Sequence, residues 1–97
     1  MPRSPVKAMA EEDVPPIDFN IFVLSLNASA LMQLGQAPDG QGQTSVDLPM
    51  ARQTIDMLAL LEDKTQGNLT GEEEQLLSQV LFDLRMRYTK QADLQAE

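Results

Sequence analysis

The sequence predicts an all-α fold in which three helices form one small domain. Apolar residues recur at helical spacing in three separate stretches of the chain. Each stretch follows a residue suited to capping a helix, and glycines or prolines separate the stretches from one another. We therefore expect helices over about 18–34, 48–65 and 71–90, with the first packed on an antiparallel hairpin of the other two.

The predicted domain covers residues 17–90 and lies between two segments that we expect not to pack. Residues 1–16 contain four prolines and an acidic run but few large apolar side chains. Such a segment cannot bury enough surface to offset chain entropy, so we predict a disordered acidic and proline-rich tail, with a short linear motif as the alternative. Residues 91–97 are predicted to be a frayed C-terminus.

The first helix, over about 18–34, is apolar on two opposite faces. Asp18 is suited to the N-cap and Gly35 to the position after the C-cap. One face contains Phe19, Phe22, Val23, Leu26, Ala30 and Leu34, and the other contains Ile21, Leu24, Ala28, Leu31 and Met32. A helix that is apolar nearly all round is normally buried nearly all round. We therefore expect this helix to be the central element.

The second helix follows a loop and is predicted to bury one side. Residues 35–47 contain three glycines and a Pro-Asp-Gly turn signal but lack the lysine of a phosphate-binding loop. Asp47 can then cap a helix over about 48–65, in which Arg52 and Asp56 are spaced to form an exposed ion pair. The inward side is predicted to contain Leu48, Ala51, Thr54, Ile55, Leu58 and Leu61, whereas Leu60 lies on the polar side.

The third helix, over about 71–90, has the strongest end signals. Thr70 and Glu73 have the spacing of a capping box, and Glu72–Glu74 place negative charge in the first turn, where the helix dipole favours it. Arg85, Arg87 and Lys90 are predicted to place positive charge in the last turns, where it complements the dipole at the other end. The inward stripe contains Leu76, Leu77, Val80, Leu81, Leu84 and Tyr88, and Phe82 and Met86 lie on the opposite side.

Four ordered blocks of this sequence carry a family resemblance. They are the Pro-Pro-Ile-Asp-Phe opening at 15–19, Ala-Arg-Gln-Thr-Ile-Asp at 51–56, Lys-Thr-Gln-Gly-Asn-Leu-Thr at 64–70 and Leu-Arg-Met-Arg-Tyr at 84–88. In this order they resemble a family of short bacterial proteins catalogued as domain of unknown function family 1844. The resemblance covers about residues 15–88 and implies an all-helical cytoplasmic bacterial protein. It implies no reaction, cofactor or catalytic residue.

Composition narrows the classes of function. The net charge is −8, so nucleic acids and anionic membranes repel the chain, and no apolar run reaches the length of a signal sequence or membrane span. We therefore expect a cytoplasmic protein. The sequence has neither histidine nor cysteine, which removes the usual general base and several metal ligands. We therefore expect that the protein is not an enzyme and that it binds no cofactor, small-molecule substrate or metal ion.

The unexplained apolar surface predicts a protein partner. A hairpin of two helices covers one face of the first helix but not both, and exposed apolar surface gathered in one place usually marks an interface. We therefore predict self-association, with a homodimer as the simplest form, or docking of another protein, through Ile21, Leu24, Ala28, Leu31, Met32, Leu60, Phe82 and Met86. The alternative is an accessory binder of nucleic acid or ribonucleoprotein that uses Arg85, Arg87, Tyr88 and Lys90 as an anion-binding cluster.

Overall fold

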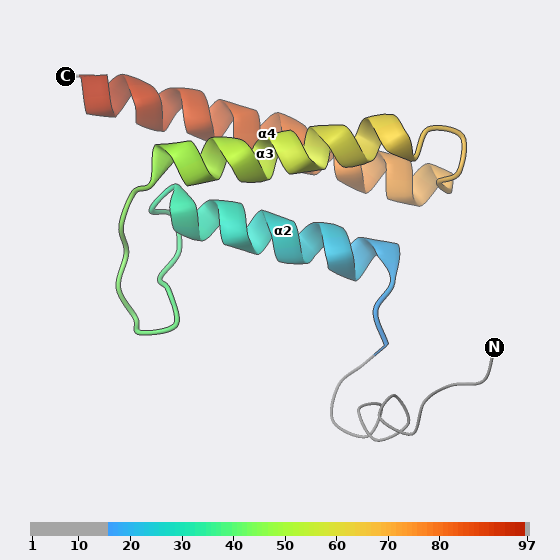
Figure 1. Cartoon of the computed structure of the whole chain (residues 1–97), viewed down its shortest axis with the longest axis horizontal. Helices are drawn as coiled ribbons and strands as arrows, with labels where there is room; N and C mark the ends of the chain where they lie inside the picture. The colour runs from blue at the N-terminus through green and yellow to red at the C-terminus, as the bar shows by residue number, and fades with distance from the viewer. Residues whose placement is uncertain (1–15, 97) are drawn as a thin grey trace.

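The predicted three-helix fold is confirmed. The computed structural model describes residues 16–96, and over this range it contains α2 (Phe19–Gln33), α3 (Leu48–Lys64) and α4 (Gly71–Ala96), with no β-strand. Each helix packs on the other two. Figure 1 shows α3 and α4 joined by a short turn and α2 alongside them, with the longer α2–α3 loop at the opposite end. No helix in the described range is long and apolar enough to span a membrane.

The ends of the helices are fixed by the caps that the sequence indicates. Asp18 Oδ1 accepts a hydrogen bond from the Ile21 amide at 2.8 Å, and Asp47 Oδ1 accepts one from the Met50 amide at 3.2 Å. The capping box of α4 is complete: the Thr70 amide donates to Glu73 Oε1 at 2.9 Å, and the Glu73 amide donates to Thr70 Oγ1 at 3.1 Å. These bonds satisfy amides that a helix leaves without internal partners.

The α2–α3 loop is held by its own hydrogen bonds. Asp39 Oδ1 accepts bonds from the amides of Gln41 at 2.8 Å and Gln43 at 3.0 Å. These bonds to the charged carboxylate, from Gln43 first and then Gln41, lower the pKa of Asp39 from its usual value. Leu34 and Val46 pair across the base of the loop as an isolated antiparallel bridge. The loop therefore has a defined conformation, in which its last residues lie beside the end of α2.

The core lies where the three inward faces meet. Its buried apolar side chains are Val23, Ala30 and Leu34 from the α2 segment, Ala51, Ile55 and Leu58 from α3, and Leu77, Val80, Leu81 and Leu84 from α4. The inward faces predicted for α3 and α4 are thereby confirmed, with Leu48, Leu61, Leu76 and Tyr88 partly buried against this core. Thr54 is also buried, and its hydroxyl donates to Gln33 Oε1 on α2 at 2.7 Å.

The structure differs from the sequence predictions for α4 and its charges. The helix continues to Ala96, beyond the predicted end near residue 90, because residues 91–96 contain no glycine or proline. Arg85, Arg87 and Lys90 therefore precede the last turn, which contains no basic residue, so the prediction that they complement the dipole there is wrong. Residue 97 lies outside the described range.

Two predictions on the other helices also need correction. Phe22, predicted to face inward, is 42% exposed, because the side of α2 that packs against both neighbours is centred on Val23 and Ala30. The predicted ion pair between Arg52 and Asp56 is not formed, and the ion pair seen within residues 16–96 joins Arg87 to Asp83 at 2.7 Å. The predicted disordered tail lies outside the described residues except for Pro16.

Candidate functional site

The side of α2 that faces away from α3 and α4 is an apolar surface without charge. Ile21, Leu24 and Met32 are 38%, 47% and 36% exposed, and Ala28 between them is also exposed. We call these four residues the α2 outer face. They lie opposite the buried Val23 and Ala30, and the whole of α2 contains no charged residue. This surface is the one that the sequence predicted on the first helix.

One residue predicted for this surface belongs partly to the interior. Leu31 packs against the core and is half-buried, so its side chain turns toward the junction with the neighbouring helices. Phe22 is also exposed near the start of α2, and Ile17, which precedes the charged cap residue Asp18, is 74% exposed. Exposed apolar side chains therefore occur along the length of α2 and also before its N-terminal cap.

The other predicted apolar residues lie on separate surfaces. Phe82 and Met86 on α4 are 67% and 54% exposed, and we call this pair the α4 outer patch. Leu60 is exposed on the outward side of α3. Because every helix packs on the other two, the outward sides of the three helices point in three different directions. The structure therefore does not bring the predicted partner-binding residues together into one site.

The α4 outer patch is a mixed surface. It borders a shallow hollow whose other lining residues are Arg85, Thr89, Lys90 and Asp93. Leu94, one turn beyond Lys90, is also exposed, although it was not among the residues predicted to bind a partner. The available signal was its position two helical turns after Met86, because residues four apart lie next to each other along a helix. Charged residues thus separate the apolar side chains on α4, in contrast to α2.

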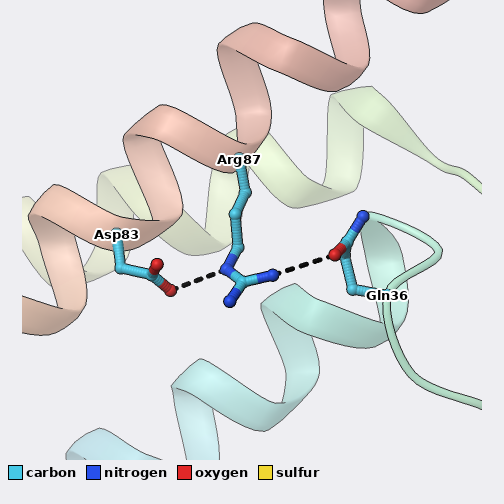
Figure 2. A network of polar contacts seen from close by, with 3 residues as sticks. All are labelled: Gln36, Asp83 and Arg87. Carbon is cyan, nitrogen blue, oxygen red and sulfur yellow. Dashed lines mark hydrogen bonds and ion pairs between the residues drawn. The ribbon is translucent and has the colours of Figure 1, made fainter.

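The predicted anion-binding cluster is not assembled on one surface. Arg87 Nε donates to Asp83 Oδ2 at 2.7 Å, and Arg87 Nη1 donates to Gln36 Oε1 at 2.9 Å. Figure 2 shows the Arg87 side chain extended between these two partners, one on α4 and one in the α2–α3 loop. Arg87 is therefore engaged within the chain, and the role of Gln36 in this contact was not visible in the sequence.

Arg85 and Tyr88 instead lie at the junction of α4 with α3. They line a small hollow together with Arg52, Ile55, Asp56 and Thr89. Asp56 places a negative charge among the cationic groups of this hollow, which opposes the binding of an anion. Lys90 lines a hollow with Arg87 and Gln36 on the other side of α4, and it also borders the α4 outer patch together with Arg85. The predicted cluster is thus divided, with Tyr88 on the side toward α3 and Arg87 on the other side of the helix.

A further polar hollow lies at the α3–α4 turn, and its lining includes the acidic and amide side chains Glu62, Gln66, Glu74 and Gln75. Within residues 16–96 no three carboxylates converge as metal ligands would. Asn20 Oδ1 on α2 is buried without a hydrogen-bond partner, and nothing in the structure explains it.

Comparison with known proteins identifies the family. A family model described as a domain of unknown function, DUF1844, matches residues 16–90, which includes all of α2 and α3 and most of α4. No curated protein and no solved structure matches the chain. The match covers more than half of the sequence and agrees with the blocks noted at 15–88. The chain therefore belongs to the DUF1844 family.

Proposed function

We propose that this chain is a non-enzymatic protein-interaction or assembly module of the bacterial cytoplasm and that the α2 outer face is its docking surface. The observation that carries the proposal is the half-exposed stripe of Ile21, Leu24 and Met32 on a helix without charge. The largest exposed apolar patch on a soluble protein is often a functional one. The family resemblance supports the bacterial and cytoplasmic setting.

The composition of α2 supports a docking role because folding alone does not require it. A surface helix that packs by one side normally carries charged or polar residues on the other side. The inward side of α2 already supplies Val23 and Ala30 to the core, and polar residues at 21, 24 and 32 would leave that packing unchanged. The apolar outer residues therefore contribute little to the fold of one chain, and contact with another protein gives them a role.

The α4 outer patch is a weaker candidate for the same function. Arg85, Lys90 and Asp93 border Phe82 and Met86, so a partner on this side would have to desolvate or pair charged groups. Single exposed apolar side chains among polar neighbours are common and need no partner. The α2 outer face has neither charges to desolvate nor a polar interruption larger than Ser25, which bonds to the Ile21 carbonyl at 2.9 Å.

Site-specific photo-crosslinking in cells tests the docking surface. A photoreactive amino acid placed at Ala28, at the centre of the α2 outer face, is expected to give discrete adducts with protein. The matched control is Gln53, an exposed polar residue on α3. Adducts at Ala28 that exceed those at Gln53 support the proposal, whether they contain this chain or another. Equal labelling at the two positions contradicts it.

A further inference from the structure

We infer that the occupant of the α2 outer face is a second copy of this chain, packed antiparallel about a twofold axis that passes between Ser25 and Ala28. This inference rests on the proposed docking function and names its partner. Three features of the surface support this pairing: its lack of charge, its symmetry along the helix and the area that it offers.

The absence of charge on α2 selects the kind of partner. A partner recognised by electrostatic attraction needs complementary charge on this face, and α2 has none from Phe19 to Gln33. The matching surface is therefore uncharged and apolar, as the α2 outer face of a second copy is. The chain carries a net charge of −8, so two copies repel each other wherever their charged faces meet. Pairing through α2 brings together the one helix that contributes nothing to this repulsion.

The order of residues along α2 is close to self-complementary. Ile21 and Met32 lie near the two ends of the α2 outer face, and the small residues Ser25 and Ala28 lie between them. In an antiparallel pair centred between Ser25 and Ala28, Ile21 meets the partner's Met32, and Ala28 meets the partner's Ser25. The small central residues permit close approach of the two helices, while the larger ones pack at both ends.

The area that α2 offers reaches that of a dimer interface only when the residue before the helix is included. At the exposed fractions given above, Ile21, Phe22, Leu24 and Met32 leave on the order of 350 Å² of exposed surface per chain, about the size of the largest apolar patch on a typical monomer, which is often functional. Two copies thus bury roughly 700 Å² through these residues, and packing of the exposed Ile17 at each edge brings the total to the roughly 1,000 Å² that a specific interface needs. A domain this small has little core of its own, so this burial also stabilises each fold.

Single cysteines provide the test, because the natural chain has none. The full chain is prepared as Ile21→Cys, Ala28→Cys and Met32→Cys, with Gln53→Cys on α3 as the matched control and Gln79→Cys on α4 as a probe of the rival surface. Each variant is oxidised mildly, alone and in pairwise mixtures. Circular dichroism confirms that each remains helical, and linked dimer is measured by mass.

The inference predicts a defined pattern of links. Ala28→Cys is expected to form linked dimer roughly a thousandfold faster than Gln53→Cys, since pairing raises the effective thiol concentration from micromolar to millimolar. Ile21→Cys is expected to link to Met32→Cys in preference to itself. Self-linking of Ile21→Cys instead overturns the antiparallel arrangement, and preferential linking of Gln79→Cys assigns the dimer to α4.

Equal, slow linking at all positions overturns the second copy as the partner. That outcome does not contradict the docking function, which photo-crosslinking at Ala28 tests separately. If the docking function is correct, the adducts at Ala28 then contain a different protein. Failure of both experiments contradicts the docking surface itself. The two experiments together therefore show whether only the proposed partner is wrong or the proposed docking function is wrong as well.

Discussion

Arg87 on α4 donates a hydrogen bond of 2.9 Å to Gln36, a residue 51 positions earlier in the loop that follows α2. The contact joins the C-terminal half of the longest helix to the end of α2. Asp83 holds the same guanidinium from the other side. The α2–α3 loop is thus held both by hydrogen bonds within the loop and by a hydrogen bond to α4.

Removing Gln36 from this contact is expected to loosen the loop with little loss of global stability. Gln36→Ala should lower the free energy of unfolding by about 0.5 kcal/mol, because Arg87 is partly exposed and solvent screens the bond. Amide hydrogen exchange should speed up in residues 35–47 and stay unchanged in α3. Gln41→Ala, which leaves the Arg87 contact intact, is the matched control. Equal exchange in both variants would contradict the role of Arg87.

The buried hydroxyl of Thr54 is expected to couple α3 to α2 through Gln33. Thr54→Val preserves shape but removes the 2.7 Å hydrogen bond, at an expected cost of about 1 kcal/mol. A double-mutant cycle with Gln33→Ala should give a coupling energy of similar size by urea denaturation. Strictly additive losses would show that the two side chains do not interact in solution.

Gly35 is expected to be required for two separable reasons. Its φ of +73° disfavours any other residue, and an added Cβ would lie 2.8 Å from Val46 Cγ2. Gly35→Ala should therefore cost about 2 kcal/mol, against about 1 kcal/mol for Gly42→Ala, which has a similar φ of +79° but open space. Val46→Ala should reduce the cost at Gly35 to that at Gly42. The absence of this rescue in thermal denaturation would rule out the steric part.

The lowered pKa of Asp39 predicts how the loop responds to acid. Its carboxylate accepts two backbone bonds in the folded state, so folding favours the charged form. The resulting stabilisation is fully present above the ordinary Asp pKa of 3.8, which applies in the unfolded chain, and is lost as the pH falls through the lower folded pKa. Carboxyl ¹³C titration by NMR should give a midpoint below 3.8. A midpoint at or above this value would mean that the Asp39 turn is not maintained in solution.

Local signals in the sequence were sufficient for the helices and their caps. Asp18, Asp47 and the Thr70–Glu73 box act within four residues of their own positions, so their hydrogen bonds depend on no distant part of the fold. The apolar periodicity of α3 and α4 gave their inward faces for the same reason, since one side of each helix is clearly more apolar than the other.

Features set by tertiary packing were less predictable. The residues of α2 are apolar on all sides, so periodicity could not determine its rotation, and Phe22 and Leu31 were assigned to the wrong sides of the boundary between core and surface. The contact of Arg87 with Gln36 depends on the loop conformation and had no sequence signal. The separation of the predicted binding residues onto three surfaces likewise follows from mutual packing of the helices.

Sedimentation equilibrium of the full chain tests the central claim most directly. The natural chain should have the mass of a dimer at both low and high salt, because an apolar interface does not depend on charge screening. Leu24→Asp should be a monomer that remains helical by circular dichroism, whereas the matched change Leu60→Asp on α3 should remain a dimer. A natural chain that is monomeric at all concentrations, or a Leu24→Asp variant that keeps the dimer mass, would contradict pairing through the α2 outer face.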